Sequence, residues 1–364
     1  MKDILLFLIL FPIFSLAQQP EKWTAQWIMH PTAEPQSHAV ILFRKNFELS
    51  EKPESFIVHL SADNHYRLFV NGQYILRGPA RGDLSHWFYE TVDIAEYLQP
   101  GKNVIASEVV NWGPKRSFTF FSQMTSFILQ GDGENGKLVN SSGGSWKCMN
   151  NLACSPKTVE WMTDRNTIDF GLYVGNPTDS IRADKYPWGW ETPDYDDSKW
   201  LPAKWCDIAG GRDQQFAGGI LYGGGKLLIP RRTGILKETK VEFNTIRRTS
   251  GIEKNENFIH DKGSLVIPAN QKVSILIDQT CETLGYPEML VSGGKNANIQ
   301  VMYSENMIVK NHAPKGNRND IEGKKWLESR MFSFLTEAIT DYLNQATSGR
   351  FVSSNWTLRP KINH

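Results

Sequence analysis

The sequence predicts an all-β protein whose main unit is a β-sandwich. Short segments in which apolar and polar residues alternate recur along most of the chain, and turn residues separate them about every ten positions. This spacing is typical of sandwiches, because each strand buries one face against the opposite sheet. Aromatic residues make up 12% of the chain, which suits the core of a β protein and also the faces that stack on sugar rings.

A tight hairpin between residues 66 and 76 is the clearest local prediction. Alternating apolar residues flank Asn71-Gly72 on both sides. This pair is preferred in two-residue type I′ turns, because both turn positions need positive φ. The preceding strand ends at Asp63-Asn64. Further strands are expected over 41–49, 56–60, 87–94, 103–110, 119–129, 273–278 and 299–303, with short strands within 146–161.

Composition divides the chain into five segments. We predict a signal peptide at 1–17, an N-terminal jelly-roll or galactose-binding-like sandwich at 18–206, a linker at 207–235, a second, incomplete sandwich at 236–325 and an aberrant tail at 326–364. The linker is glycine-rich and has almost no periodicity, so it could equally be a long surface loop. In the tail the alternation stops, and residues 326–343 predict a helix.

The N-terminus has the pattern of a secretory signal. Lys2 precedes an apolar run over 4–16 that is too short to span a bilayer, and Ala17 ends a small-x-small cleavage pattern. We therefore expect a periplasmic or secreted protein with no transmembrane segment after cleavage. Export permits disulfides, so Cys148 and Cys154 are a candidate pair, with free buried thiols as the alternative.

Charge and motifs exclude several classes of function. The chain has 40 basic and 39 acidic residues and no long basic block, so nothing favours nucleic acid as a partner. The serine-nucleophile, zinc-protease and phosphate-loop motifs are all absent from the sequence. We therefore predict no catalytic residue from the sequence itself.

Polar side chains at strand ends form the first candidate site. Asp63, Asn64 and Asn111 are planar groups that can hold adjacent sugar hydroxyls. Carboxylate and amide oxygens also suit Ca²⁺, so Asp63 is a candidate calcium ligand and Ca²⁺ the candidate cofactor. The alternative is that Asp63 and Asn64 only supply turn conformations.

A second candidate site follows the hairpin. Arg77, Arg81, Asp83 and His86 lie close together in the sequence and could line a substrate groove. The alternative is an internal network of ion pairs that pins the loop at 78–82.

Several separated segments resemble one family in the order of the chain. They include W-T-A-Q-W-I at 23–28, A-D-N-H-Y-R-L-F-V-N-G at 62–72, R-G-P-A-R-G-D at 77–83, P-D-Y-D-D-S-K-W at 193–200 and G-Y-P-E-M-L-V-S-G-G-K at 285–295. These segments resemble the N-terminal region of bacterial α-L-rhamnosidases of glycoside hydrolase family 78. The resemblance extends over roughly residues 20–325.

The resemblance implies an exported enzyme that removes terminal α-L-rhamnose from glycans or glycosides with inversion. In the family, the catalytic glutamates lie on an (α/α)₆ barrel, and no position here matches them. Some relatives have a rhamnose-binding sandwich with a bound calcium ion. Asp63, Asn64 and Asn111 match the spacing of its ligands, so the resemblance implies a rhamnose or calcium site there.

The tail departs from the family after residue 324. One permitted codon choice for residues 333–360, read one nucleotide earlier, encodes a peptide that resembles the missing family segment. We therefore expect that a frameshift produced the tail; the alternative is a genuine short protein with its own helical end. The expected function is the N-terminal part of a rhamnosidase-like hydrolase without its catalytic domain. The alternatives are a stand-alone, calcium-assisted rhamnose-binding module and a purely structural sandwich.

Overall fold

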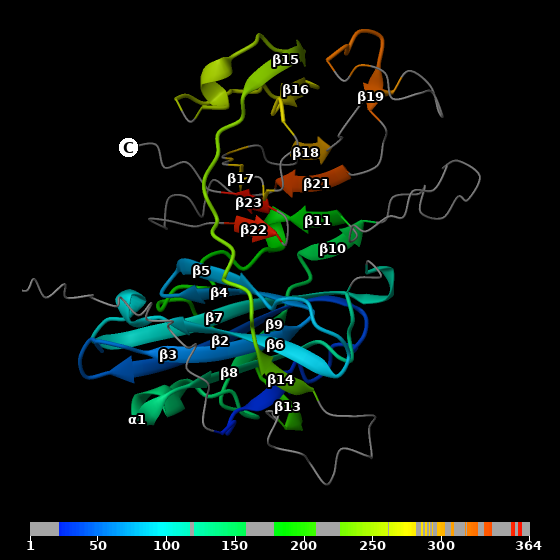
Figure 1. Ribbon diagram of the computed structural model, residues 1–364. Helices are drawn as coiled ribbons and strands as arrows, with labels where there is room; N and C mark the ends of the chain where they lie inside the picture. Colours follow the sequence, from blue (N-terminus) through cyan, green and yellow to red (C-terminus); the bar gives the residue numbers. More distant parts are fainter. Residues whose placement is uncertain are drawn as a thin grey trace, which may run out of the picture.

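Two six-stranded sheets packed face to face form the main unit of the computed structural model (Figure 1). The structure describes residues 22–116, 120–157, 178–208 and 226–260, and shorter stretches between 262 and 358. The predicted signal peptide lies outside these residues. Across the described residues, no helix is long and apolar enough to cross a membrane. The prediction of an all-β sandwich is confirmed.

Each sheet is antiparallel over most of its width. The first has the order β13-β1-β8-β3-β6-β14, with β1 (Gln26–Met29), β3 (Ile57–Asp63), β6 (His86–Asp93), β8 (Ser126–Gly131), β13 (Lys204–Ile208) and β14 (Leu227–Pro230). The second has the order β12-β9-β2-β7-β4-β5, with β2 (His38–Leu49), β4 (His65–Val70), β5 (Gln73–Gly78), β7 (Gly101–Trp112), β9 (Lys147–Asn150) and β12 (Leu201–Pro202). A short helix, α1 (Gly133–Gly136), follows β8.

The hairpin between β4 and β5 has the predicted turn. Val70 pairs with Gln73, which leaves Asn71 and Gly72 as a two-residue connection. Their φ values are 49° and 82°, so both have the positive φ that a type I′ turn requires.

The core lies between the two sheets. Phe43 of β2 and Phe127 of β8 stack across it with their ring centroids 5.6 Å apart, and Trp146 contacts Phe127 edge-on. All three side chains are fully buried. Alternate residues of β2, such as Val40 and Leu42, point to the outer face of the second sheet, which is also covered.

The Trp- and Asp-rich segment at 181–200 covers that outer face. Trp190 and Trp200 pack there against residues of β2 and β7. Arg44 of β2 lies on the same outer face and contacts this segment, where its Nε donates to Asp197 Oδ2 at 3.1 Å. The second sheet is therefore buried on both faces, which explains the long apolar runs of its central strands.

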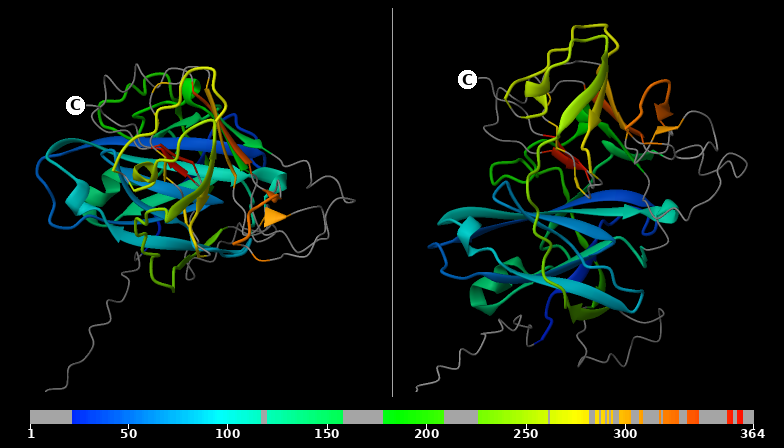
Figure 2. Two further views of the ribbon diagram at one scale, coloured as in Figure 1. Left: turned by 90° about the horizontal axis from the view of Figure 1, so that it is seen from above. Right: turned by 45° about the horizontal axis from the view of Figure 1, so that its top comes forward.

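The chain returns to the sandwich within the predicted linker. β14 pairs in parallel with β6 at the edge of the first sheet, with Leu228 opposite Trp87. From there residues 231–244 run as an extended segment along one side of the sandwich to β15 (Figures 1 and 2). Part of 207–235 therefore contributes a strand to the first sheet.

Smaller sheets lie beyond the second sheet (Figure 1). They are β10-β11-β21-β18, β15-β16, β17-β23-β22 and β19-β20, built from β10 (Cys154–Lys157), β11 (Thr178–Arg182), β15 (Thr245–Ser250), β16 (Ser274–Asp278), β17 (Glu288–Met289), β18 (Ala297–Met302), β19 (Met307–Ile308), β20 (Lys325–Trp326), β21 (Met331–Thr336), β22 (Phe351–Ser353) and β23 (Trp356–Leu358). The strands predicted at 273–278 and 299–303 correspond to β16 and β18.

The tail differs from the predicted helix, and Cys148 follows the alternative of a free buried thiol. Where a helix was predicted over 326–343, β21 instead pairs with β18 and β11, because sheet partners outweigh a weak local helical pattern. Cys148 is a free thiol in the core, and burial raises its pKa to about 12. The candidate disulfide to Cys154 therefore does not form.

Candidate functional site

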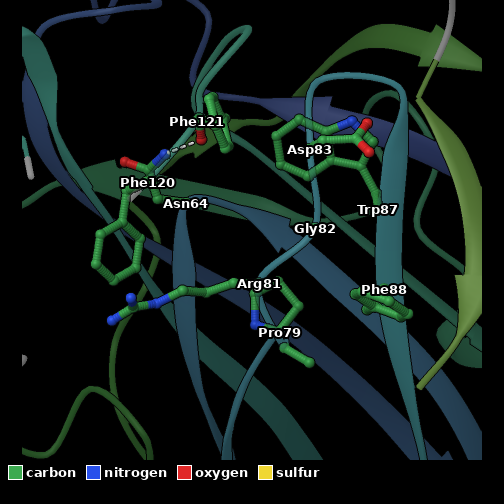
Figure 3. A pocket seen from close by; sticks show the side chains of 10 residues that line it. Asn64, Pro79, Arg81, Gly82, Asp83, Trp87, Phe88, Phe120 and Phe121 are labelled. Atoms are coloured by element: carbon green, nitrogen blue, oxygen red, sulfur yellow. Dashed lines mark hydrogen bonds between the residues drawn. The ribbon is translucent and has the colours of Figure 1, made fainter. Parts of the chain in front are cut away.

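An open pocket lies at one end of the sandwich, between the end of β3, the loop after β5, the start of β6 and the loop before β8 (Figure 3). It contains about 360 Å³ of empty space, part of it open to solvent. Its lining residues are Asn64, Pro79, Ala80, Arg81, Gly82, Asp83, Trp87, Phe88, Phe120 and Phe121. The lining combines aromatic rings with a few polar groups, which is the usual composition of a small-molecule site.

Asn64 supplies the most informative polar group of the pocket. Its Nδ2 donates to the carbonyl oxygen of Phe121 at 2.5 Å and to Asp63 Oδ1 at 3.2 Å, which fixes the amide plane (Figure 3). Its Oδ1 is buried and has no donor among the residues that the structure describes. A buried acceptor without a donor costs free energy, so Oδ1 is a polar group whose capacity to accept a hydrogen bond the described residues leave unused.

Aromatic rings form one wall of the pocket. The Arg81 guanidinium lies 4.2 Å from the centroid of the Phe120 ring, which is itself packed on Trp112 with centroids 4.8 Å apart. The neighbouring Phe121 is 46% exposed, so part of its ring surface stays accessible. An apolar face that stays accessible beside a fixed amide suits a ligand with both C–H and O–H groups.

A buried carboxylate shapes the loop at 78–83. Glu90 of β6 accepts from Ala80 N at 2.8 Å and from Tyr66 Oη at 2.7 Å, and Arg231 lies 3.2 Å away. Burial raises the pKa of Glu90, although these hydrogen bonds and Arg231 oppose the increase. A β-carbon on Gly78 would lie only 2.4 Å from Glu90 Oε2, so the loop needs glycine there. Sequence reasoning missed Glu90, because one acidic residue in a strand has no distinctive pattern.

Asp83 and His86 form a pair at the mouth of the pocket. Asp83 accepts from the backbone N–H groups of Ser85 and His86, and His86 Nδ1 lies 2.9 Å from Asp83 Oδ2. The hydrogen bond to the His86 side chain, followed by that to Ser85, lowers the pKa of Asp83. Both side chains are about half exposed, so this pair shapes a turn and leaves carboxylate surface available to a ligand.

Arg77 lies apart from the pocket lining. Its Nε donates to Glu238 at 2.7 Å, and its guanidinium lies 3.4 Å from the centroid of the Tyr286 ring. Arg77 therefore links the sandwich to the extended segment at 231–244 and to Tyr286 rather than to Asp83. The second predicted cluster therefore does not form one group: Arg81, Asp83 and His86 lie at the pocket, and Arg77 lies apart from it. The loop at 78–82 is held by the hydrogen bonds of Glu90 instead of by ion pairs among these four residues.

The remaining predicted residues, Asp63 and Asn111, support the pocket from behind. Asp63 is fully buried, and its Oδ2 accepts from Gln123 N at 2.7 Å and Met124 N at 2.9 Å. Asn111 Nδ2 donates to Ser122 and Thr125 hydroxyls, both at 2.9 Å, and its Oδ1 accepts from Gly113 N at 2.8 Å. Both residues hold the loop that carries Phe120 and Phe121.

Two basic side chains, His65 and Lys226, lie next to Asn64 and Asp63. Burial, and then the charges of Arg77, Arg67 and Arg81, lower the pKa of His65 to about 3. His65 is therefore neutral at physiological pH. A further cation, Lys226, lies 3.4 Å from Asp63 Oδ2 with both side chains fully buried. Sequence reasoning missed Lys226, because it follows a glycine-rich stretch without periodicity.

Comparison with known proteins shows which sequences and structures resemble this chain. No protein-family model matches the chain. An α-L-rhamnosidase of Streptomyces avermitilis is 25% identical over 193 residues, which are 52% of this chain and 15% of that protein. The rhamnosidase of glycoside hydrolase family 78 from Bacillus sp. GL1 has a similar fold, with a TM-score of 0.52 and 23% identity over 64% of this chain.

The chain is distantly similar to α-L-rhamnosidases of glycoside hydrolase family 78. The resemblance stated from the sequence motifs is thereby confirmed. The chain spans 15% of the length of the Streptomyces protein and 22% of the Bacillus chain, so the similarity concerns a limited part of those enzymes.

Proposed function

We propose that this chain is the non-catalytic, carbohydrate-binding region of an exported α-L-rhamnosidase-like glycoside hydrolase, and that the pocket beside Asn64 recognises a terminal L-rhamnose. The observation that carries the proposal is the juxtaposition of the buried Asn64 Oδ1, which lacks a donor among the described residues, with the half-buried ring of Phe120 and the exposed ring of Phe121. The similarity to enzymes named for action on rhamnosides supports the choice of sugar.

Recognition would use complementary faces of the sugar. A hydroxyl donates to Asn64 Oδ1, while the C–H face and methyl group of the 6-deoxy sugar pack on the Phe120 ring. Asp83 at the mouth offers a half-exposed carboxylate that accepts from a second hydroxyl. L-Rhamnose carries both an apolar methyl group and adjacent hydroxyls, so it satisfies each part of this lining.

We assign catalysis to no residue of this chain. Inverting hydrolysis requires two carboxyl groups that face each other across the scissile bond, roughly 6.5–9.5 Å apart. Among the acidic groups at the pocket, Asp63 is enclosed by backbone amides and Lys226, and Glu90 is enclosed by the loop at 78–83. Asp83 alone reaches the pocket surface, which fits binding rather than cleavage.

Calorimetric titration of L-rhamnose into the protein tests the proposal. We expect one site, with binding weakened about tenfold or more by Phe120→Ala, since a buried aromatic contact of this kind contributes about 1–3 kcal/mol. Trp205→Ala is the matched control, because Trp205 is 47% exposed on β13 and lies outside the pocket lining. Equal affinity in the Phe120 variant and the wild type would place the sugar elsewhere.

A chromogenic α-L-rhamnoside separates the binding role from an enzymatic one. The proposal predicts binding of the glycoside without turnover by this chain. Steady release of the chromophore, at a rate proportional to protein concentration, would show that catalytic carboxylates are present after all.

A further inference from the structure

Lys226 is the least expected group near the pocket. It directly precedes β14, and its side chain is fully buried. Its Nζ donates to the Met124 carbonyl oxygen at 3.2 Å and to Ser126 Oγ. It also lies 4.4 Å from the ring centroid of Trp27 and 4.8 Å from that of Trp87. A buried ammonium needs such partners, because desolvation is otherwise prohibitive.

The partner of this ammonium is the Asp63 carboxylate. Lys226 Nζ lies 3.4 Å from Asp63 Oδ2, and both side chains have zero exposure. Asp63 Oδ2 also accepts from the N–H groups of Gln123 and Met124, while Oδ1 accepts from Asn64 Nδ2. The carboxylate is therefore neutralised and hydrogen-bonded on both oxygens by groups of the chain itself.

This arrangement does not fit a calcium ion at the three predicted ligands. Ca²⁺ takes about 6–8 oxygen ligands at roughly 2.3–2.6 Å. Asp63 is already saturated, and Asn111 Oδ1 accepts from Gly113 N, so Asn64 Oδ1 is the one acceptor of the three without a donor among the described residues. Among the residues that the structure describes, no group of three or more His, Cys, Asp or Glu side chains is placed to hold a metal ion.

The position of the Lys226 ammonium is a second reason why calcium does not fit at Asp63. A divalent cation on Asp63 would lie within a few ångströms of a fully buried positive charge. Two positive charges that are this close and buried in the protein interior repel strongly. The carboxylate, carbonyl and hydroxyl oxygens that surround Lys226 are of the types that calcium prefers, and the lysine occupies them.

We propose that Lys226 is the built-in cation of this site: it neutralises Asp63, fixes the loop at 121–126 and makes recognition of the neutral sugar independent of calcium. The part that concerns the sugar rests on the proposed function, whereas the exclusion of calcium from Asp63 does not. Lys226 acts as a positioning residue, because its ammonium is bonded to Asp63 and the loop and meets the pocket lining only at the ring of Trp87.

Ion binding by the full chain tests the proposal without any sugar. Equilibrium dialysis and thermal denaturation are compared in 1 mM Ca²⁺ and in excess chelator. We expect no stoichiometric calcium and the same melting temperature in both buffers. One bound ion per chain, or a melting temperature that rises by several degrees with calcium, would overturn the proposal.

A double-mutant cycle tests the pairing itself. Lys226→Met and Asp63→Asn each leave one buried charge without its partner, so each should lower the melting temperature clearly. The double variant Lys226→Met/Asp63→Asn has neither charge, and we expect it to recover most of the loss. Additive losses would contradict a direct pairing. If a single variant does not fold, recovery of folding by the double variant gives the same answer.

Calorimetry with L-rhamnose separates this inference from the proposed function. Binding of equal strength in calcium and in chelator supports both. Binding that requires calcium overturns the inference and leaves the proposed function intact. Absence of rhamnose binding in both buffers overturns the proposed function and the sugar part of the inference, and the ion measurements then decide the rest.

Discussion

The substitution Asp197→Ala tests how the Trp- and Asp-rich segment is held on the sandwich. Asp197 Oδ2 accepts from Arg44 Nε at 3.1 Å and from Asn46 Nδ2 at 2.8 Å, and Oδ1 accepts from Lys147 Nζ at 2.7 Å. The Arg44 side chain is fully buried and that of Asp197 is 10% exposed. Removing the carboxylate leaves the buried guanidinium without its anionic partner.

The expected loss is large for a single substitution. Breaking a buried ion pair by removing one partner costs about 3–5 kcal/mol. Arg44 keeps contacts with the carbonyl oxygens of Trp190 and Thr192 and with the ring of Tyr195, which favours the lower end of this range. We therefore predict a fall of about 3 kcal/mol in the free energy of unfolding of Asp197→Ala.

Urea denaturation followed by tryptophan fluorescence measures this loss, because Trp190 and Trp200 lie in the segment at risk. Asp194→Ala is the matched control: Asp194 is an exposed aspartate of the same segment, and we expect its loss to change stability by less than about 0.5 kcal/mol. Losses of similar size in the two variants would refute the idea that Asp197 anchors this segment.

Three further predictions concern stability. Burial raises the pKa of Glu191 to about 7, so the folded chain keeps a proton that the unfolded chain releases near pH 4–5. Stability should therefore fall between about pH 5 and pH 7, and Glu191→Gln should reduce this fall by about 1–3 kcal/mol; parallel pH profiles would contradict the assignment. Phe127→Ala should cost about 3–5 kcal/mol in urea denaturation, because Phe43, Trp146 and Tyr66 surround the ring; a cost below about 1 kcal/mol would show that the core collapses easily. Gly72→Ala should lower stability by about 1 kcal/mol, because the turn needs a φ of 82°, and an unchanged melting temperature would argue against the type I′ turn.

Local chemistry made the sandwich predictable. Asn71-Gly72 specifies its turn through two neighbouring residues, and period-2 alternation marks strands that bury one face. Pairing over long distances carries no such signal. β14 joins β6 in parallel across more than a hundred residues, and its partner can be found only in three dimensions.

The candidate site shows the same division between local and distant information. The strand end at Asp63-Asn64 predicted a cluster of polar groups, and the structure places Asn64 in the pocket. What the sequence could not show is the partner of each group. Asp63 meets Lys226 from a distant segment, and Asn111 uses its amide on Ser122 and Thr125, so neither side chain lines the pocket.

The most direct test of the central claim is the affinity of L-rhamnose for the wild type and for Asn64→Ala, measured by calorimetry. Asn150→Ala is the matched control, because Asn150 is a half-buried asparagine outside the pocket lining. We predict one site in the wild type and in the control, and affinity at least about tenfold weaker in Asn64→Ala, since a hydrogen bond to a buried amide contributes about 1–2 kcal/mol. Undiminished affinity in Asn64→Ala, or no binding by the wild type, would contradict the account.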